Sequence, residues 1–538
     1  MCGISAVFGY GLKDGGSLVM KSLEAVRHRG HSLFETAVFD NCALGANRLE
    51  IVDRDSAKQP QPNEDGTLFA VLNGEIYNHD ALRAELGKKG HIFRTVSDTE
   101  VLAHLYEEHG PGMVKMLDSE MFAFFIYDKG RNSFFSARDR YGVKPLYYAR
   151  DSSGNWHFAS EMKQLVQFAD IPEIHDFPPG HYMLGGKLER YHTMPAPEDV
   201  MDDSVASIVQ NLRRLFDEAV RKRLDTDLPV AVFFSGGLDS AAVLTSARKY
   251  KEVTAITVGR PDSPDMLAAR RYCDESGVPI IRFHPPDAEE LAAMIPEVVR
   301  ITESFEPNLV RHGALSLFAA KLARENGFRV VLCGEGSDEL FAGYEVFGQS
   351  RGLHLSYLLH HGLKRLPYVV FQRVDRTSMF HTIEVRLPFF DTEFADYAMR
   401  IPGELKLRDS GGRGVAKWVL REAMKDRLPG YIVERQKMPF TSGAGCDVGG
   451  DGRPFSEIMS RMLSDAEFGR MKAECASWNI AGREAAYYFR LFGECLYTKA
   501  GFARNRPTYG ILRHPMRAVA GYIIPHLGWR ISSMRRPA

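Results

Sequence analysis

The stretch Val230-Ala231-Val232-Phe233-Phe234-Ser235-Gly236-Gly237-Leu238-Asp239-Ser240 decides the fold of this chain. Its five apolar residues, which follow Pro229, predict a short strand buried in a parallel sheet. The two glycines allow a tight turn and a close approach of the main chain to a ligand. The residues from Ser240 to Ala247 predict a helix. A strand, a glycine turn and a helix N-terminus form an anion site, because free N–H groups and the positive end of the helix dipole point at one spot.

The acidic residue of this turn, Asp239, would repel a phosphate unless a cation lay between them, so it predicts Mg²⁺. Two glycines alone would leave an ordinary turn of an α/β domain as the alternative. The full string SGGLDS resembles the pyrophosphate-binding loop of the ATP pyrophosphatase families, which form acyl-adenylates. The resemblance implies that the loop binds ATP.

Strands and helices alternate in the rest of this half of the chain. Apolar runs predict strands at 253–258, 278–283 and 329–332, and helices at 204–224, 266–276, 291–304 and 313–326. This alternation predicts an α/β doubly wound parallel sheet, in which ligands bind at the carboxyl ends of the strands. We expect the strand ends at Ser235, Gly259 and Cys333 to meet in one crevice.

Length and composition predict an ordinary protein of several domains. The 538 residues exceed the size of one hydrophobic core. The net charge of −1 favours no nucleic-acid partner. Seven cysteines without a CxxC pair indicate neither a zinc site nor a disulfide framework, and they fit a reducing cytoplasm. The sequence shows no signal peptide and no apolar run of roughly 18 residues, so no membrane span is expected.

The cysteine at position 2 could become the first residue of the chain. Removal of Met1 would leave a thiol and a free α-amine on Cys2, and an amine with a pKa of about 8 can act as the thiol's own general base. The alternative is a chance cysteine in a buried first strand, where it would behave as a small hydrophobe.

Five short motifs follow Cys2. They are Arg27-His28-Arg29-Gly30, Asn47-Arg48-Leu49-Glu50-Ile51-Val52-Asp53, Asn73-Gly74-Glu75-Ile76-Tyr77-Asn78, Ser97-Asp98-Thr99-Glu100 and Ala137-Arg138-Asp139-Arg140-Tyr141-Gly142-Val143-Lys144-Pro145-Leu146-Tyr147-Tyr148. In this order they resemble the N-terminal-nucleophile (Ntn) glutaminase domain of class II amidotransferases. The resemblance covers residues 2 to about 192 and implies an α+β Ntn hydrolase sandwich.

The resemblance also implies a role for the polar residues of these motifs. Cys2 would attack the side-chain amide of glutamine, release ammonia and leave a thioester that water hydrolyses. Asn73 and the Gly74 N–H would hold the oxyanion. The glutamine-binding residues would be Arg48, Leu49, Glu50, Ile51, Val52, Asn73, Gly74, Glu75 and Asp98. Arg48 would bind the carboxylate of glutamine, and Glu75 and Asp98 would bind its ammonium group. Taken singly, these charged residues would be ordinary solvated surface groups.

The first half of the chain departs from the family pattern in two places. His31-Ser32 stands where the family has Pro-Asp, so we expect a differently shaped loop over the glutamine. Glu120 stands where the family has a glycine before Met121, and this exchange requires a negative φ.

A second polar loop follows the last predicted strand. Cys333 precedes Gly334-Glu335-Gly336-Ser337-Asp338-Glu339, which resembles the synthetase domain of asparagine synthetases, as do residues 375–379, 383–391 and 434–440. The resemblance covers 205 to about 442 and implies a sheet of the ATP pyrophosphatase (adenine nucleotide alpha hydrolase-like) type. It implies ATP contacts at Phe233, Ser235, Gly236, Gly237, Asp239, Ser240, Val258, Cys333 and Gly334. Asp239 and Asp338 would hold Mg²⁺, and Glu335 and Lys437 would take part in adenylation. A polar surface turn and a solvated lysine are the alternatives.

We therefore expect a glutamine-hydrolysing amidotransferase that activates aspartate as an acyl-AMP. Ammonia from Cys2 would reach it through a dry channel between the domains. The expected domains are 2–192 (glutaminase), 193–204 (linker), 205–505 (synthetase) and 506–538 (a basic tail). ATP and Mg²⁺ are the expected cofactors, glutamine and aspartate or another acid the substrates, and the cytoplasm the compartment; a homodimer is left open.

Two other functions stay open. The first is amidation of another carboxylate, on a peptide, a cell-envelope precursor or a secondary metabolite. The second is a non-catalytic binding paralogue, against which the intact motifs argue.

Overall fold

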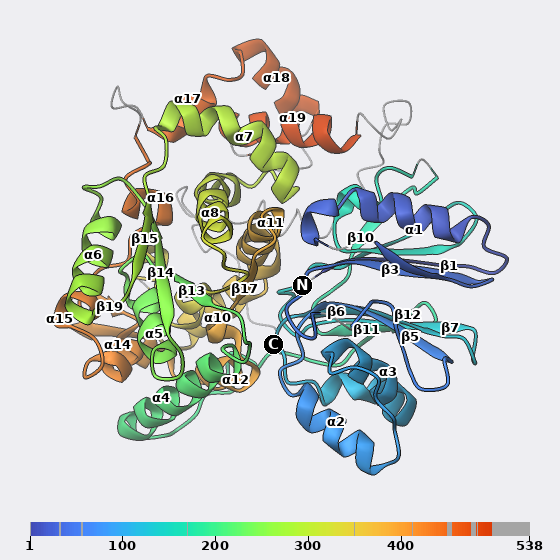
Figure 1. The fold of residues 1–538 in the computed structure, drawn as a ribbon. Coiled ribbons are helices and arrows are strands. Elements are labelled where there is room, and N and C mark those ends of the chain that lie inside the picture. Colours follow the sequence, from blue (N-terminus) through green and yellow to red (C-terminus); the bar gives the residue numbers. More distant parts are fainter. Residues whose placement is uncertain are drawn as a thin grey trace, which may run out of the picture.

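The computed structural model describes residues 2–497 except 32–33, 55–56, 169, 349, 411–412, 449–453, 475–479 and 481. These residues form two halves that lie side by side (Figure 1). Strands β1 to β12 belong to the first half, and the parallel sheet belongs to the second. The expected basic tail, 506–538, lies outside the described residues.

Two antiparallel sheets of six strands each build the first half. The first has the order β10-β8-β9-β1-β3-β2, with β1 Cys2–Phe8, β2 Glu35–Val38, β3 Cys42–Arg48, β8 Tyr147–Arg150, β9 Trp156–Ala159 and β10 Ile174–Asp176. The second has the order β12-β11-β7-β6-β5-β4, with β4 Gln61–Pro62, β5 Leu68–Gly74, β6 Phe122–Asp128, β7 Ser133–Arg138, β11 His181–Leu184 and β12 Lys187–Arg190. Helix α1 (Gly15–Glu24) covers the first sheet, and α2 (His79–Lys88) and α3 (Asp98–His109) cover the second (Figure 1). These four layers confirm the expected α+β sandwich.

The first strand is buried along its whole length, which explains its nearly uninterrupted apolar sequence. Val7 packs in one cluster with Val19 and Leu23 of α1. Ala6 belongs to the cluster between the two sheets, which includes Phe125 of β6. A strand enclosed by a helix and a second sheet has little freedom to move. Its first residue, Cys2, is therefore held in a fixed place.

A five-stranded parallel sheet forms the centre of the second half and confirms the expected doubly wound fold. Its order is β15-β14-β13-β16-β17, with β13 Val230–Phe233, β14 Val253–Val258, β15 Ile280–Phe283, β16 Val330–Leu332 and β17 Glu384–Arg386. The central strand β13 lies between β14 and β16, where the chain order reverses. Ligands of such sheets bind at this switch point. The opening motif of the sequence therefore ends at the expected binding edge.

The helices around this sheet lie close to the predicted ranges, and side-chain caps begin all of them except the helix that starts after Gly237. They are α4 Val205–Lys222, α5 Leu238–Ala247, α6 Pro264–Ser276, α7 Ala288–Thr302 and α8 Pro307–Glu325. Asp287 caps α7, and Glu306 caps α8 by accepting from the Leu309 N–H. These caps explain why both helices begin several residues before the predicted positions.

The rest of the described chain adds shorter elements around the sheet. They are α9 Ser337–Leu340, α10 Gly352–Leu363, α11 Gln372–Phe380, α12 Thr392–Met399, α13 Gly403–Lys406, the hairpin β18 Leu407–Ser410 and β19 Arg413–Ala416, α14 Trp418–Met424, α15 Gly430–Val433, α16 Phe440–Gly443, α17 Phe455–Ser460, α18 Asp465–Glu474 and α19 Arg483–Tyr497. In Figure 1, α17, α18 and α19 lie together with α7 at one end of the second half.

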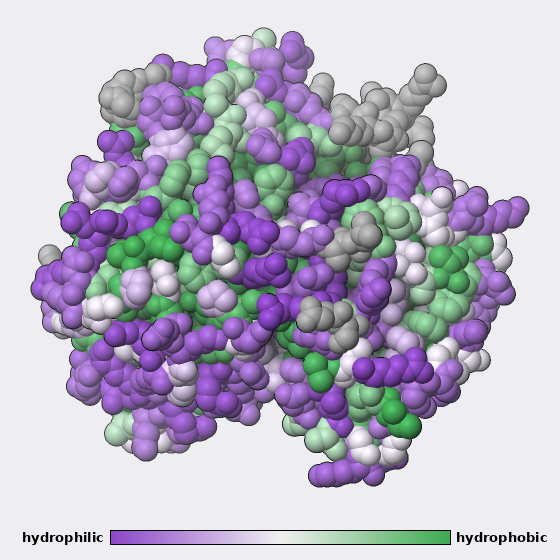
Figure 2. Space-filling view, in the orientation of Figure 1, coloured by the Kyte–Doolittle hydropathy of each residue, from purple (hydrophilic) through white to green (hydrophobic). Residues whose placement is uncertain are grey.

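The face of the molecule in Figure 2 is mostly hydrophilic, and its apolar side chains form small groups over both halves. Among the described helices, none has both the length and the apolar character needed to cross a membrane. Cys2, Cys42, Cys273, Cys333 and Cys446 are free thiols.

Glu120, the departure from the family glycine, lies where the two halves meet. Its φ is negative, as its β-carbon requires. Its carboxylate forms an ion pair with Arg223 of the second half, and both side chains are fully buried. Asp391 Oδ2 lies 3.1 Å from the same guanidinium. The chain thus has a buried interdomain ion pair where the family has a glycine.

Candidate active sites

Cys2, the predicted nucleophile, is held at the start of β1 by three side chains. Its backbone N donates to Asn73 Oδ1 (3.1 Å), and Arg29 Nε donates to its carbonyl oxygen (3.1 Å). Gln59 Nε2 lies 3.6 Å from Cys2 Sγ. Burial raises the pKa of the Cys2 thiol, and the positive charge of Arg48 opposes this rise. A thiol with a raised pKa needs a base beside it, and removal of Met1 would turn the Cys2 nitrogen into that base.

A free amide donor lies next to Cys2. Asn73 Nδ2 is buried and, among the described residues, has no hydrogen-bond partner. Buried donors without partners are rare, and one beside a nucleophile suits an oxyanion. Gly74 follows at the end of β5 with a φ of 150°, and a Cβ there would lie 2.1 Å from Met121 O. Only glycine therefore fits the second position of the predicted oxyanion hole.

Arg48, the predicted carboxylate clamp, contacts main-chain oxygens. Its Nη2 donates to the carbonyls of Val52 (2.5 Å) and Asp53 (2.6 Å). The side chain thus folds the loop after β3 around itself. The role of Arg48 in binding glutamine stays a prediction, and the structure adds a role in shaping the loop.

The loop after Arg48 is attached to the second half of the molecule. Leu49 and Ile51 are buried in a core cluster that is shared with the parallel-sheet half. The Glu50 carbonyl accepts a hydrogen bond from Arg329 of that half (3.2 Å). His31, the other departure from the family, lies 3.2 Å from Thr382 Oγ1, and Ser32 lies outside the described residues. Loops at the glutaminase site are therefore shaped partly by the synthetase half.

Glu75 and Asp98 are predicted to bind the ammonium group of glutamine, and they lie close to each other in the fold. The contact runs through Ile76, the residue after Glu75, which is 22 residues from Asp98 in the sequence. Asp98, at the start of α3, accepts a hydrogen bond from the Ile76 N–H at 3.1 Å. Burial raises the pKa of Glu75 well above its usual range, and the carboxylates of Glu384 and Asp98 add to the rise. A bound ammonium group would relieve this concentration of negative charge.

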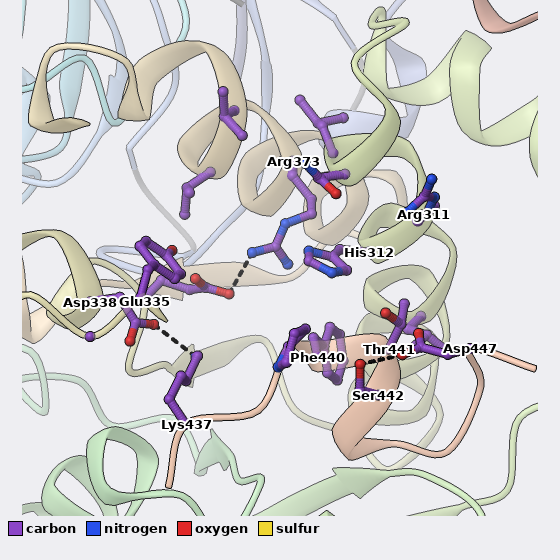
Figure 3. Close-up of a pocket in the computed structure, with 18 of the residues that line it drawn as sticks. Arg311, His312, Glu335, Asp338, Arg373, Lys437, Phe440, Thr441, Ser442 and Asp447 are labelled. Atoms are coloured by element: carbon purple, nitrogen blue, oxygen red, sulfur yellow. Dashed lines mark hydrogen bonds and ion pairs between the residues drawn. The ribbon is translucent and has the colours of Figure 1, made fainter. Parts of the chain in front are cut away.

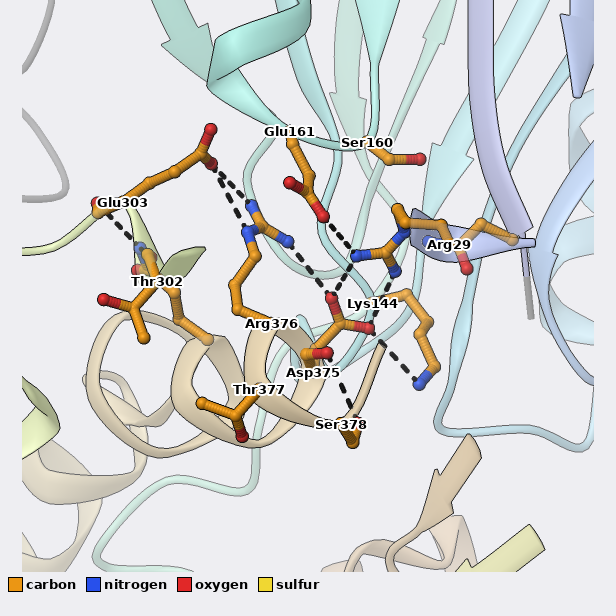
Figure 4. A network of polar contacts seen from close by, with 12 residues as sticks. Arg29, Lys144, Ser160, Glu161, Thr302, Glu303, Asp375, Arg376, Thr377 and Ser378 are labelled. Carbon is orange, nitrogen blue, oxygen red and sulfur yellow. Dashed lines mark hydrogen bonds and ion pairs between the residues drawn. The ribbon is translucent and has the colours of Figure 1, made fainter. Parts of the chain in front are cut away.

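A buried ion network joins the two halves beside Cys2 (Figure 4). Arg29 contacts Glu161 at 2.7 Å and Asp375 at 2.8 Å. Arg376 contacts Asp375 at 3.1 Å and Glu303 at 3.2 Å. Because Arg29 also donates to the Cys2 carbonyl, the network connects the nucleophile to α11 of the second half. The sequence marked the motifs that contain Arg29 and Asp375 but gave no indication that they meet.

The SGGLDS loop is held by its own hydroxyls. Ser240 Oγ accepts from the Ser235 N–H (3.2 Å), and Ser235 Oγ accepts from the Gly237 N–H (3.3 Å). Gly236 has a φ of 67°, and a Cβ there would lie 2.6 Å from the Ala269 nitrogen of α6. The loop is thus packed so closely that its glycines cannot be replaced without a shift.

The two predicted Mg²⁺ ligands, Asp239 and Asp338, converge on one point. Lys417 Nζ lies 2.5 Å from Asp239 Oδ2 and 2.6 Å from Asp338 Oδ1. Lys437 lies 2.7 Å from the other oxygen of Asp338. Burial would raise the pKa of Asp338, but the two lysines lower it to about 2. Two carboxylates that both contact the ammonium group of Lys417 could also share a divalent cation, so the residues fit Mg²⁺.

Sequence reasoning missed Lys417. The residue is 2% exposed and has a φ of 58°, an uncommon conformation for lysine. A single lysine before the apolar residues of α14 gives no signal in the sequence. Lys417 is also 178 residues from Asp239 in the sequence, so their ion pair could not be predicted from it.

A cavity of about 160 Å³ lies at the carboxyl ends of the strands. It is lined by seven of the nine predicted ATP residues: Phe233, Ser235, Asp239, Ser240, Val258, Cys333 and Gly334. Gly236 and Gly237 do not line it. The predicted crevice is thus present at Ser235 and Cys333, while Gly259 does not line it and its neighbour Val258 does. The predicted Mg²⁺ ligands and Lys437 lie in its wall.

A larger cavity of about 610 Å³ adjoins the first (Figure 3). The two share Glu335, Asp338, Arg373, Lys437 and Phe440. Arg373 forms an ion pair with Glu335 at 2.5 Å. Both cavities therefore open onto one cluster of charged side chains, where two ligands could meet.

The second cavity also contains a histidine that stays neutral. Burial lowers the pKa of His312 to about 3, and the positive charges of Arg373 and Lys437 lower it in the same direction. The lining offers Arg373 and Lys437 to a negative group of a ligand, and it also holds the carboxylates of Glu335, Glu339 and Glu345, which suit a positive group.

Two family models match the chain. The glutamine amidotransferase domain model matches residues 1–193, and the asparagine synthase model matches residues 211–358 and 352–477. The chain is 35% identical over 519 residues to the glutamine-hydrolysing asparagine synthetase of Sandersonia aurantiaca, covering 92% of this chain and 96% of the relative. It is 35% identical over 532 residues to glutamine-hydrolysing asparagine synthetase 3 of Arabidopsis thaliana, covering 94% and 89%. It is 32% identical over 557 residues to a probable glutamine-hydrolysing asparagine synthetase of Dictyostelium discoideum, covering 96% and 98%.

Proposed function

Because this chain belongs to the family of glutamine-hydrolysing asparagine synthetases, we propose that it makes asparagine from aspartate, ATP and glutamine. The observation that carries the proposal is the combination of two sites in one chain. Cys2 with a free amide donor occupies the first half, and a cavity lined by the SGGLDS loop occupies the second.

In the first half, the Cys2 thiol would give its proton to the α-amine and attack the amide carbon of glutamine. The amine would return the proton to the leaving ammonia. Asn73 Nδ2 would donate to the oxyanion, since this donor is buried without a partner. Glu75 and Asp98 would bind the ammonium group of glutamine, and Arg48 with its loop the carboxylate. Water would then release glutamate from the thioester.

In the second half, the aspartate side-chain carboxylate would attack the α-phosphorus of ATP, with pyrophosphate as the leaving group. The SGGLDS loop would receive the pyrophosphate through its N–H groups. Asp239 and Asp338 would hold Mg²⁺, which supplies positive charge to the polyphosphate. Lys437 would contribute a second positive charge, because it already lies against Asp338. The larger cavity would hold aspartate beside Glu335 and Arg373.

Ammonia would cross between the halves along apolar side chains. One buried cluster contains residues of both halves: Leu49, Ile51, Met121 and Val143 from the first, and Leu332, Val385 and Leu387 from the second. An apolar lining favours neutral ammonia, the nucleophilic form, over ammonium. We place the enzyme in the cytoplasm, in keeping with the free thiols of Cys2, Cys42, Cys273, Cys333 and Cys446.

The identity of the acid is tested by pyrophosphate exchange. The protein would be incubated with ATP, Mg²⁺ and labelled pyrophosphate, together with aspartate, glutamate or larger acids. Label should enter ATP with aspartate and not with the others. Exchange with a different acid alone would make the chain an amidotransferase of another carboxylate, and no exchange with any acid would favour a binding protein.

Replacement of the nucleophile tests the two-site arrangement. Cys2→Ala should abolish asparagine formation from glutamine and leave formation from ammonium salts at near the parent rate, because the nucleotide cavity does not contain Cys2. Asparagine would be measured with each nitrogen source. Equal loss of both activities in folded protein would contradict two separable sites.

A further inference from the structure

A cluster of metal-ligating side chains lies away from both active sites, on the outer side of the glutaminase half. It consists of Glu64, His91, His104 and Glu107, whose ligand atoms all lie within 4.8 Å of one another. Glu64 lies in the turn between β4 and β5, His91 follows α2, and the other two residues belong to α3. In Figure 1, α2 and α3 lie on the far side of the second sheet from α1.

The two imidazole rings and the Glu64 carboxylate face one another at the spacing of metal ligands. His91 Nδ1 and His104 Nδ1 are 3.2 Å apart. They lie 2.9 Å and 2.7 Å from the two oxygens of Glu64. Ligand atoms around a tetrahedral zinc ion are separated by about 3.3 Å, given bonds of about 2.0–2.2 Å. The observed separations are close to this value, and Glu107 lies within reach as a fourth ligand.

The outward nitrogens of both rings face carboxylates. His91 Nε2 lies 3.3 Å from Glu108, and His104 Nε2 lies 3.7 Å from Glu100. Histidines that bind metals commonly direct their second nitrogen, as an N–H, to a carboxylate. With the proton on Nε2, each Nδ1 lone pair points inward, toward the other ring and Glu64.

Hydrogen bonds do not fully satisfy this cluster, of which only His104 is fully buried. His104 is fully buried, and among the described residues its Nε2 has no hydrogen-bond partner. The Glu64 oxygen nearest His104 is likewise buried without a hydrogen bond of acceptable geometry. Four carboxylates surround the two rings, and Lys89, 3.0 Å from Glu108, pairs with the outermost. His91 Nδ1 has hydrogen-bond geometry to Glu64 (2.9 Å) and to His104 Nδ1 (3.2 Å), so the Glu64 oxygen that lies 2.7 Å from His104 Nδ1 is the ligand atom left without a bond. A cation among these atoms would satisfy it.

We propose that Glu64, His91, His104 and Glu107 bind a divalent transition-metal ion of the zinc type. Imidazole and carboxylate ligands suit Zn²⁺. The ion would tie together the β4–β5 turn, the segment after α2 and the middle of α3. His104 lies six residues after Asp98 on α3, or about 9 Å along the helix axis. The metal would therefore fix the helix whose first residue faces the end of β5, and it would act as a structural ion.

The test uses full-length protein that has been dialysed free of transition metals and then supplied with excess Mg²⁺. Titration with ZnCl₂ in a calorimeter should show one site. Co²⁺ in place of Zn²⁺ should give the visible spectrum of tetrahedral coordination. Zinc should also raise the melting temperature. His91→Gln should weaken zinc binding by more than about 100-fold, since changes even outside the ligand set cost about 10–100-fold.

Matched variants keep the test decisive if His91→Gln folds poorly. Glu107→Gln changes an exposed ligand and keeps an amide oxygen that can accept from Asn63 Nδ2, as the carboxylate does at 3.0 Å, and it should weaken zinc binding by about tenfold or more. His109→Gln, at the end of the same helix but outside the ligand set, should bind zinc like the parent. The proposal fails if the parent binds no zinc, because the rings then hold protons alone. It also fails if both ligand variants bind zinc as tightly as the parent, because the ion then lies elsewhere.

Discussion

At the scale of residues, the ammonium group of Lys417 holds the proposed nucleotide site together. Lys417 contacts both Asp239 and Asp338, so the two carboxylates are aimed at one point. The three side chains come from the ends of different elements. A change in any one should therefore affect catalysis more than folding.

Asp239→Asn removes one of these charges and keeps the volume of the side chain. We expect pyrophosphate release and ammonia-dependent synthesis to fall by at least about 100-fold, because loss of a charged contact to the reacting group costs about 3 kcal/mol. Glutamine hydrolysis at Cys2 should continue. Pyrophosphate and glutamate would be measured side by side, with Asp262→Asn, an exposed acid before α6, as the control. Near-parent pyrophosphate release would remove Asp239 from the metal ligands.

His312 predicts how acid affects the second half. Its pKa of about 3 lies below the unfolded value of about 6.5, so the folded protein binds fewer protons between these pH values. Stability is then complete above pH 6.5 and declines as the pH falls toward 3, by at most about 1.4 kcal/mol per pH unit.

His312→Gln should flatten this decline. Urea unfolding at a series of pH values would compare it with the parent and with His175→Gln, a surface histidine with 43% of its side chain exposed. A parent and His312→Gln that lose stability in parallel would show that His312 is not the group responsible.

The sequence could predict the residues whose chemistry is local to a motif, and the structure brings most of these together. Asn73 accepts a hydrogen bond from the Cys2 nitrogen, and seven of the nine predicted ATP residues line one cavity. Partners that become neighbours only on folding could not be predicted. Lys417 and the cluster of Glu64, His91, His104 and Glu107 are of this kind, because their members come from separate segments.

At the scale of elements, the end of β5 is the most constrained point of the glutaminase site. Gly74→Ala would place a Cβ against Met121 O, at 2.1 Å in the present backbone. The strand end must then shift, and the oxyanion donors shift with it. We expect glutamine-dependent activity to fall by about 100–1,000-fold, as for loss of an oxyanion donor. Gly87→Ala, in α2 with open space around it, is the matched control. Ammonia-dependent synthesis should not change, and a parallel loss would indicate misfolding.

Element types were predictable where apolar runs were long. Strand β17 was missed because three residues, Glu384, Val385 and Arg386, give no apolar run. It forms a strand because β16 offers a parallel edge and because Glu384 and Arg386 pair at 2.6 Å. Tertiary contacts decide such an element, and local sequence does not.

At the scale of the whole molecule, the buried network of Figure 4 is the connection through which the two reactions can be coordinated. Asp375→Asn would remove the charge that faces Arg29 and keep the shape of the side chain. We expect glutamine hydrolysis and ammonia-dependent synthesis to continue, but the ratio of glutamate to asparagine should rise several-fold above one. The reason is that the interface beside Cys2 would no longer close tightly. Both products would be counted from the same reaction.

Tyr141→Phe serves as the control for this variant, because Tyr141 makes a different contact between the halves, to Asp396 at 2.8 Å. It should leave the product ratio near one. An Asp375→Asn protein that is folded and still fully coupled would assign the network to stability alone.

The lysine between Asp239 and Asp338 has a practical consequence for handling the protein. Lys417, a group of the chain itself, already neutralises Asp239 and Asp338. A chelating storage buffer should therefore leave the melting temperature of the synthetase half unchanged. Any loss of shelf life in such a buffer should begin in the other half, at α3. EDTA in a purification buffer would remove the metal at α3. The purified enzyme would then make asparagine from ammonium salts but use glutamine poorly.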